Sequence, residues 1–363
     1  MKHRATGDAS TTHLYTTHES NLRTGRLDSV DTRHHFEYGA PMDTGLNDIF
    51  GDTATAQPAT ADSYGIRPSA YRLPDATRIR SVTLQVSELA RSRDFYENTL
   101  GFRPITVGLD RVSLGAHGND DVLVELIENR AGKRRAAKGS LGLYHVAILL
   151  PTRADLGRFL RHLEEDGVRA GAGDHLVSEA LYLQDPDNLG IEVYADRPRE
   201  GWRRRNKQLV MATDPVDVQG LLAAAGSAPW SGIPDGTSIG HVHLHVGDID
   251  LAGSFYSDGV GFDRVVWSYP GALFMSAGGY HHHLGTNVWA GAGAKPATPD
   301  DPQLLEWVLE LPSEADVNAV SASLQRVGQT VTPSAEGTSI TTRDPWGTAL
   351  RVDVPRVGVG LNL

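Results

Sequence analysis

The chain has 363 residues, of which 40% are hydrophobic and 22% are charged, the balance of a soluble globular protein with room for two domains. It has no cysteine, which excludes disulfides and thiolate chemistry, and no run approaches the ~18 apolar residues that a membrane span needs. The net charge of −11 disfavours nucleic-acid binding despite the basic run at 203–205. Because the chain has no cysteine, any metal must be bound through its 15 histidines and its carboxylates.

Residues 1–76 are predicted to be a flexible N-terminal extension. They are rich in Thr, Asp, Ser, Gly and His and show no sustained apolar period. No apolar segment follows the initial Met-Lys-His-Arg, so we expect no signal peptide and a cytoplasmic protein.

An internal repeat begins at Ile79. Residues 79–86 (IRSVTLQV) alternate as a strand does, and residues 239–246 (IGHVHLHV) repeat the pattern 160 positions later. The same offset relates two further features, the Phe-Tyr pairs at 95 and 255 and the Gly-Phe pairs at 101 and 261. Each strand is therefore expected to lead into an amphipathic helix that ends at a left-handed glycine.

A second repeated pair lies between and after these segments. Residues 145–151 (HVAILLP) correspond to residues 306–312 (EWVLELP). Each is followed by a predicted helix, an Asp-Pro turn and a final strand. These elements are the helices 153–166 and 314–327, the turns at Asp185 and Asp344, and the strands 189–194 and 348–354.

The pattern thus predicts an α+β chain of four β-α-β-β-β modules, at 79–130, 142–198, 239–291 and 303–354, with a connector over 201–236. Tandem modules of this kind resemble the vicinal oxygen chelate superfamily, over about three quarters of the chain. The resemblance implies two domains, 77–200 and 237–355, whose mixed sheets curl into cups that can hold a divalent metal.

In that architecture, metal ligands come from the first and last strands of the modules that share a cup. The corresponding residues, in module order, are Ser81 and Glu125, His145 and Glu192, His241 and Asn287, and Glu306 and Arg351. Modules one and four offer no imidazole there, and the permanent charge of Arg351 opposes a cation. We expect Arg351 to pair with Glu125 or Glu306 instead.

The pairing of the modules decides which ligands meet. If module two faces module three, His145, Glu192 and His241 form the two-histidine, one-carboxylate set that suits non-haem Fe(II), or Mn(II). The alternative pairs one with two and three with four, and it separates His241 from the other two ligands. We favour the first pairing. A single histidine on a strand is more often an ordinary core residue, but these residues occupy equivalent positions in two repeats.

Residues 173–192 (GDHLVSEALYLQDPDNLGIE) resemble the signature of type I extradiol ring-cleavage dioxygenases. The matching features are Gly173, His175, Leu181-Tyr182, Asp185-Pro186 and Glu192. Asn188 departs from the usual Gly or Pro, but asparagine tolerates a left-handed turn. The resemblance implies that His175 and Tyr182 line the cup and hydrogen-bond substrate oxygens. A buried tyrosine with a satisfied hydroxyl is the alternative.

Residues 280–287 (YHHHLGTN) contain three consecutive histidines, and the same family carries an acid–base histidine near this point. Strict alternation places His281, His283 and Asn287 on one face and His282 on the other. We therefore predict His283 as the acid–base residue, with His281 next. His243, His281 and Asn287 are expected to line the substrate site.

Taken together, the resemblance implies an Fe(II)-dependent extradiol dioxygenase that opens a catechol-type ring with O2. From the charge and the lack of long apolar runs we expect no nucleic-acid or membrane partner, and we expect a homo-oligomer. Two alternatives keep the fold: a glyoxalase-like isomerase or resistance transferase, which usually needs a second carboxylate ligand, and a non-catalytic binding protein. The intact ligand set together with His175 and Tyr182 favours the dioxygenase. The ring substrate is not determined by these residues.

Overall fold

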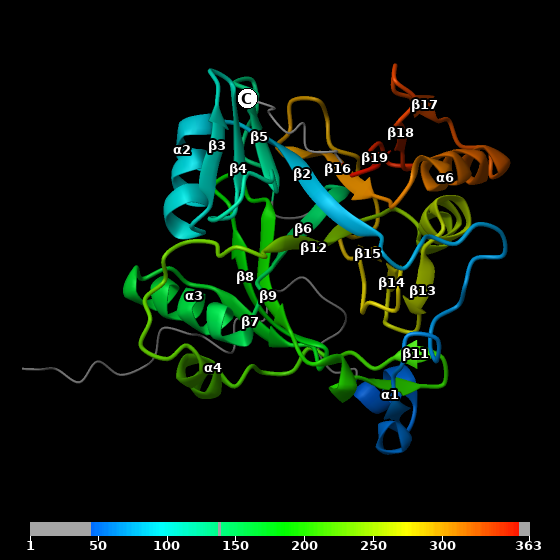
Figure 1. Ribbon diagram of the computed structural model, residues 1–363, viewed down its shortest axis with the longest axis horizontal. Helices are drawn as coiled ribbons and strands as arrows, with labels where there is room; N and C mark the ends of the chain where they lie inside the picture. Colours follow the sequence, from blue (N-terminus) through cyan, green and yellow to red (C-terminus); the bar gives the residue numbers. More distant parts are fainter. Residues whose placement is uncertain (1–44, 137–138, 356–363) are drawn as a thin grey trace, which may run out of the picture.

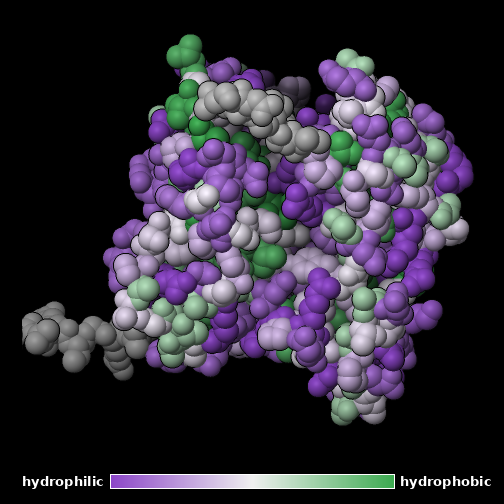
Figure 2. Space-filling model, viewed as in Figure 1, coloured by the Kyte–Doolittle hydropathy of each residue, from purple (hydrophilic) through white to green (hydrophobic). Residues whose placement is uncertain are grey.

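The computed structural model describes residues 45–136 and 139–355. Over these ranges no helix is both long enough and apolar enough to cross a membrane. The face shown in Figure 2 is mostly hydrophilic, with hydrophobic residues scattered among the polar ones, as is usual for a protein surface.

The first half of the chain contains two runs of a strand, a helix and three further strands (Figure 1). The first run comprises β2 (Arg78–Val86), α2 (Leu89–Asp94) with a π-helical continuation (Phe95–Thr99), β3 (Arg103–Val107), β4 (Arg111–Gly115) and β5 (Val124–Glu128). The second comprises β6 (Gly142–Leu149), α3 (Arg153–Glu165), β7 (Gly171–Asp174), β8 (Ser178–Gln184) and β9 (Gly190–Asp196).

The second half repeats this order after a linking region that holds a 3-10 turn (Arg199–Gly201), β10 (Arg203–Arg205), β11 (Gln208–Leu209) and α4 (Val218–Ala224). One run is β12 (Ser238–His245), α5 (Ile249–Gly253) with a π-helical continuation (Ser254–Val260), β13 (Asp263–Val266), β14 (Ala272–Ser276) and β15 (Leu284–Asn287). The other is β16 (Gln303–Glu310), α6 (Glu314–Arg326), β17 (Thr332–Pro333), β18 (Ile340–Arg343) and β19 (Ala349–Asp353).

Sixteen of the described strands form one mixed sheet with two halves, and β1 (Gln57–Pro58), β10 and β11 form a separate small sheet. In one half of the sheet β6 pairs antiparallel with β12, and in the other half β2 pairs antiparallel with β16. We call the half that contains β6–β9 and β12–β15 the histidine half-sheet, and the half that contains β2–β5 and β16–β19 the arginine half-sheet. Their link is an antiparallel pairing of β2 with β12 at Ile79 and Ile239. The α+β class is confirmed, and the domain limits 77–200 and 237–355 stay a prediction.

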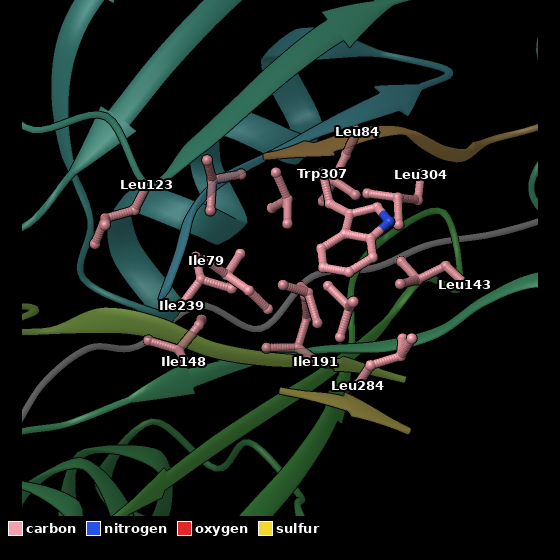
Figure 3. Close-up of a cluster of buried hydrophobic side chains, with 14 of the residues drawn as sticks. Ile79, Leu84, Leu123, Leu143, Ile148, Ile191, Ile239, Leu284, Leu304 and Trp307 are labelled. Carbon is pink, nitrogen blue, oxygen red and sulfur yellow. The ribbon is translucent and has the colours of Figure 1, made fainter. Parts of the chain in front are cut away.

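A hydrophobic core lies between the two half-sheets (Figure 3). Side chains alternate across a strand, so β12 directs Val242 and Leu244 into this core and its histidines to the opposite face. Figure 3 shows Trp307 of β16 among aliphatic side chains from both halves, including Ile191 and Leu284. Strand β12 therefore contributes to the core on one face and presents its histidines on the other.

The repeat is visible in detail at the two Asp-Pro turns. Asp185 accepts hydrogen bonds from the backbone N–H groups of residues 187 and 189, and Asp344 accepts the equivalent bonds from residues 346 and 348. The buried hydroxyls of Tyr96 and Tyr256 donate to these two carboxylates. Burial raises the pKa of Asp185 to about 7. Residues matched by sequence offset thus make matched contacts.

Part of the predicted flexible extension is ordered, which corrects the limit at residue 76. Residues 45–76 contain α1 (Leu46–Phe50), a 3-10 turn (Thr53–Thr55) and β1 (Gln57–Pro58), which pairs with β10. The Tyr64 hydroxyl donates to the Gly279 carbonyl at 2.7 Å, and Arg72 forms an ion pair with Asp263 at 2.7 Å. These distant partners could not be inferred from local composition. Residues 1–44 of the extension lie outside the described residues.

The bulge in β12 at Gly240 gives a stability prediction. A Cβ at this position would lie 1.8 Å from the hydroxyl oxygen of Tyr194, which is fully buried. We expect Gly240→Ala to lower the free energy of unfolding by about 3 kcal/mol, because the core must shift to admit the methyl group. Urea denaturation would measure the loss. Gly201→Ala, where a Cβ meets nothing within 4 Å, is the matched control and should change stability by less than about 0.5 kcal/mol.

Candidate metal centre and adjoining cavity

Three neighbouring strands bring the predicted ligands together. His241 on β12 lies opposite Ala147 on β6, and Ala147 lies beside Glu192 on the parallel strand β9. His145 is two residues away from Ala147 on β6 and therefore projects from the same face. The small side chain of Ala147 leaves space between the larger ones. The favoured pairing of modules two and three agrees with this strand order.

The three ligand atoms form a nearly equilateral triangle. Glu192 Oε2 lies 3.0 Å from His145 Nε2 and 3.1 Å from His241 Nε2, and the two nitrogens are 3.3 Å apart. Two ligands at right angles, each about 2.1 Å from a metal, are separated by about 3.0 Å. The triangle thus has the size of one face of an octahedral site. Among the described residues, this is the one group of its kind.

The electrostatics of the triangle suit a cation. Burial lowers the pKa of His241 to about 4, so its imidazole is neutral and free to coordinate. Burial alone would raise the pKa of Glu192, but the adjacent His241 and His145 outweigh burial and hold that pKa well below its usual value. All three side chains are at least nine-tenths buried. A buried carboxylate beside two imidazoles is well satisfied by a divalent metal.

The triangle forms part of the wall of a hollow of about 440 Å³, its mouth included. The other residues that line the hollow come from several elements, and they are His175, Tyr182, Met211, Ala212, Thr213, His243, Tyr269, Phe274, His282 and Trp289. Three of these, residues 211–213, belong to the linking region. The sequence contained no signal for residues 211–213, because nothing local shows that this segment folds over the site.

His175 and Tyr182 lie where the dioxygenase signature predicts, in the lining of the hollow. His175 Nδ1 lies 2.6 Å from the carbonyl oxygen of Ala212, which can only accept, so Nδ1 donates. In neutral His175 the other nitrogen, Nε2, then accepts from the Tyr182 hydroxyl at 2.5 Å. Burial raises the pKa of Tyr182 well above 10, which keeps the phenol protonated. Asn188 adopts a φ of 69°, the left-handed conformation that was expected.

The structure corrects the expected orientation of the three histidines. His282 lines the hollow, with its ring centroid 4.1 Å from that of His241. His283 points away, packs near Phe262, and accepts a hydrogen bond at Nδ1 from the backbone N–H of Ala277. His281 is fully buried and does not line the hollow. The prediction from strict alternation is wrong here because β15 begins only at Leu284, and the three histidines precede the regular strand.

Of the other predicted lining residues, His243 lies in the wall of the hollow and Asn287 does not. Asn287 lies behind His243, donates from Nδ2 to His243 Nε2 at 2.9 Å, and accepts from His245 Nδ1 at 2.6 Å. Burial lowers the pKa of His243 well below its usual value, so the ring is neutral. Asn287 thus orients two histidines and has no free oxygen directed at the metal triangle.

The arginine half-sheet lacks a comparable ligand set among its described residues. Arg351 lies 3.1 Å from Glu306, as one of the two predicted pairings requires, and Glu125 lies 3.8 Å from Arg111. Burial raises the pKa of Glu306, and Arg351 partly opposes that rise. A guanidinium occupies the position equivalent to Glu192, which leaves this half-sheet without a place for a cation.

Comparisons with known proteins agree with the fold and identify the family of the chain. Residues 78–193 match the family model of the Glyoxalase/Bleomycin resistance protein/Dioxygenase superfamily. Over 258 residues the chain is 44% identical to the catechol-2,3-dioxygenase of Bacillus subtilis (strain 168), a match that covers 70% of this chain and 90% of that protein. A crystal structure of a putative dioxygenase from Bacillus subtilis superposes with a TM-score of 0.54, 14% identity and coverage of 79% of this chain and 86% of that one. The chain therefore belongs to the glyoxalase/bleomycin resistance protein/dioxygenase superfamily and is a homologue of a catechol-2,3-dioxygenase.

Proposed function

We propose that this protein is an Fe(II)-dependent extradiol dioxygenase that opens the ring of a catechol-type substrate with O2. The observation that carries the proposal is the triangle of His145, Glu192 and His241 at the wall of a hollow that also holds acid–base groups. Two neutral imidazoles and one carboxylate would leave an Fe(II) site one net positive charge and open coordination positions. The 44% identity to a catechol-2,3-dioxygenase supports the same chemistry.

When bound, the metal would supply a place where diol and dioxygen meet and exchange electrons. The protein's own groups handle protons and shape. His282 and the hydrogen-bonded pair of His175 and Tyr182 face the hollow and can accept or donate a proton at a substrate oxygen. Phe274 and Trp289 give the hollow aromatic walls that suit a planar ring.

A glyoxalase-like reaction is less well supported, because such sites usually need a further ligand. The fourth position in this half-sheet belongs to Asn287, whose amide is engaged by His243 and His245. The same donor set would also accept Mn(II).

We also propose, from the sequence repeat, that the four strand–helix–strand runs are four modules in tandem. We further propose that the chain forms a homo-oligomer, and light scattering would measure its mass in solution.

The direct test is reconstitution under anaerobic conditions with Fe(II), followed by addition of a catechol and air. Oxygen uptake should match the formation of a yellow ring-fission product. Mn(II) should be compared in parallel, and Zn(II), which has no redox chemistry, is the inactive control. Absence of turnover across a panel of catechols and hydroquinones, with about one iron bound per chain, would contradict the proposal.

A further inference from the structure

The histidine run contains a hydrogen-bonded chain that leads out of the hollow. His282 Nδ1 lies 2.7 Å from His281 Nδ1, and His281 Nε2 lies 3.0 Å from Asp196 Oδ1. Asp196 ends β9, and its side chain is 29% exposed, whereas that of His281 is fully buried. The chain therefore connects a side chain in the hollow to one at the surface.

Each link of this chain restricts the next, because each nitrogen of a neutral imidazole is either a donor or an acceptor. An ionised carboxylate can only accept, so His281 must donate from Nε2. A neutral His281 then accepts at Nδ1, and His282 must donate from its own Nδ1. His282 Nε2 is then left with a lone pair, on a side chain that lines the hollow.

The rings are held in the orientation that this scheme requires. His281 packs against Tyr280, Trp202 and Tyr194, with ring centroids 4.1, 5.6 and 5.9 Å away. Asp196 is also fixed, because the Tyr280 hydroxyl donates to it at 3.1 Å and in turn contacts the Tyr194 hydroxyl at 2.7 Å. The contacts leave the His281 ring little freedom to rotate.

We propose that Asp196 and His281 are positioning residues that fix His282 as the Nδ1–H tautomer, with Nε2 presented to the hollow as a base. This proposal deepens the proposed function, on which it rests for the substrate. It assigns the two residues a defined effect: they determine whether His282 takes a proton from a bound diol or offers one to it.

The tautomer can be measured without turnover, by ¹⁵N NMR of histidine-labelled, full-length protein loaded with diamagnetic Zn(II). The His282 signal is assigned by its loss in His282→Gln. The wild-type protein should show His282 protonated at Nδ1. In His281→Phe, which keeps the aromatic packing but removes the acceptor, this preference should be lost. An Nε2–H tautomer in the wild type, as a doubly protonated His281 would impose, overturns the proposal whether or not the protein cleaves catechols.

Kinetics of the iron-loaded protein provide the second readout. We expect His281→Phe to lower kcat by about 10²-fold with little change in KM or iron content. His281→Asn, whose Oδ1 can still accept from His282, should recover most of that loss. His162→Phe makes the same change at a half-buried histidine of α3 outside the hollow and should change kcat by less than about 3-fold. Equal losses in His281→Phe and His281→Asn, or a comparable loss in His162→Phe, would contradict the assignment.

Discussion

Replacing His241 with alanine is expected to abolish stoichiometric iron binding. The wild-type protein should hold about one Fe(II) per chain after reconstitution and gel filtration, and the variant should hold only background iron. His241 Nε2 is one corner of a triangle with sides of 3.0–3.3 Å, so its loss leaves two protein ligands instead of three. Loss of a residue that merely supports a ligand costs about 10–100-fold in affinity, and loss of the ligand itself should cost more. His145→Ala and Glu192→Ala should behave alike.

Two matched variants make this experiment specific. Glu125→Ala removes the carboxylate that the alternative module pairing would use, and this residue lies instead near Arg111 in the arginine half-sheet. His162→Ala removes a half-buried histidine of α3 that contacts the Thr99 carbonyl. Both variants should keep full iron content. Full occupancy in His241→Ala, together with loss in Glu125→Ala, would show that the metal lies elsewhere.

Thermal stability gives an independent measure of the same site. A ligand that binds only the folded protein raises the free energy of unfolding by about 2.7 kcal/mol at a concentration 100 times its Kd. The melting temperature of the wild type should therefore rise when Fe(II) or Zn(II) is added, and that of His241→Ala should not. This comparison does not require any substrate.

Much of the fold was predictable because the chain repeats itself. Strand alternation located β2 and β12, and the helices expected at 153–166 and 314–327 correspond to α3 (Arg153–Glu165) and α6 (Glu314–Arg326). Equivalent positions in the repeats also identified the residues of the metal triangle. Such features depend on period and offset, which a single sequence records directly.

The errors arose where geometry depends on distant parts of the chain. Strict alternation extended back from β15 misplaces His283, because the strand begins at Leu284 and the preceding turn rotates the histidines. Similarly, Met211 reaches the hollow only because the linking region folds back over it. The polar composition of residues 45–76 predicts flexibility, yet Tyr64 is buried against Gly279. Long-range packing decided each of these cases.

Replacing His282 with glutamine is expected to lower kcat by about 10²–10³-fold while iron content stays at about one per chain. His282 lines the hollow beside His241, but it is not a corner of the metal triangle. Its loss should therefore remove proton transfer at the substrate and leave metal binding intact. Burial lowers the pKa of His282 well below its usual value, so the ring is neutral before substrate binds and is able to accept a proton. Steady-state oxygen uptake with measured iron content separates these effects, and KM for the diol should change little.

His283→Gln is the matched comparison, because the two histidines are adjacent, similarly buried and indistinguishable by composition. His283 accepts a hydrogen bond from the Ala277 N–H outside the hollow, so its replacement should cost about 1 kcal/mol of stability. Its effect on kcat should be much smaller than that of His282→Gln. If His283→Gln instead lost turnover with iron retained and His282→Gln did not, strict strand alternation would describe the working enzyme better than the present arrangement. The paired variants thus decide which of two neighbouring imidazoles meets the substrate.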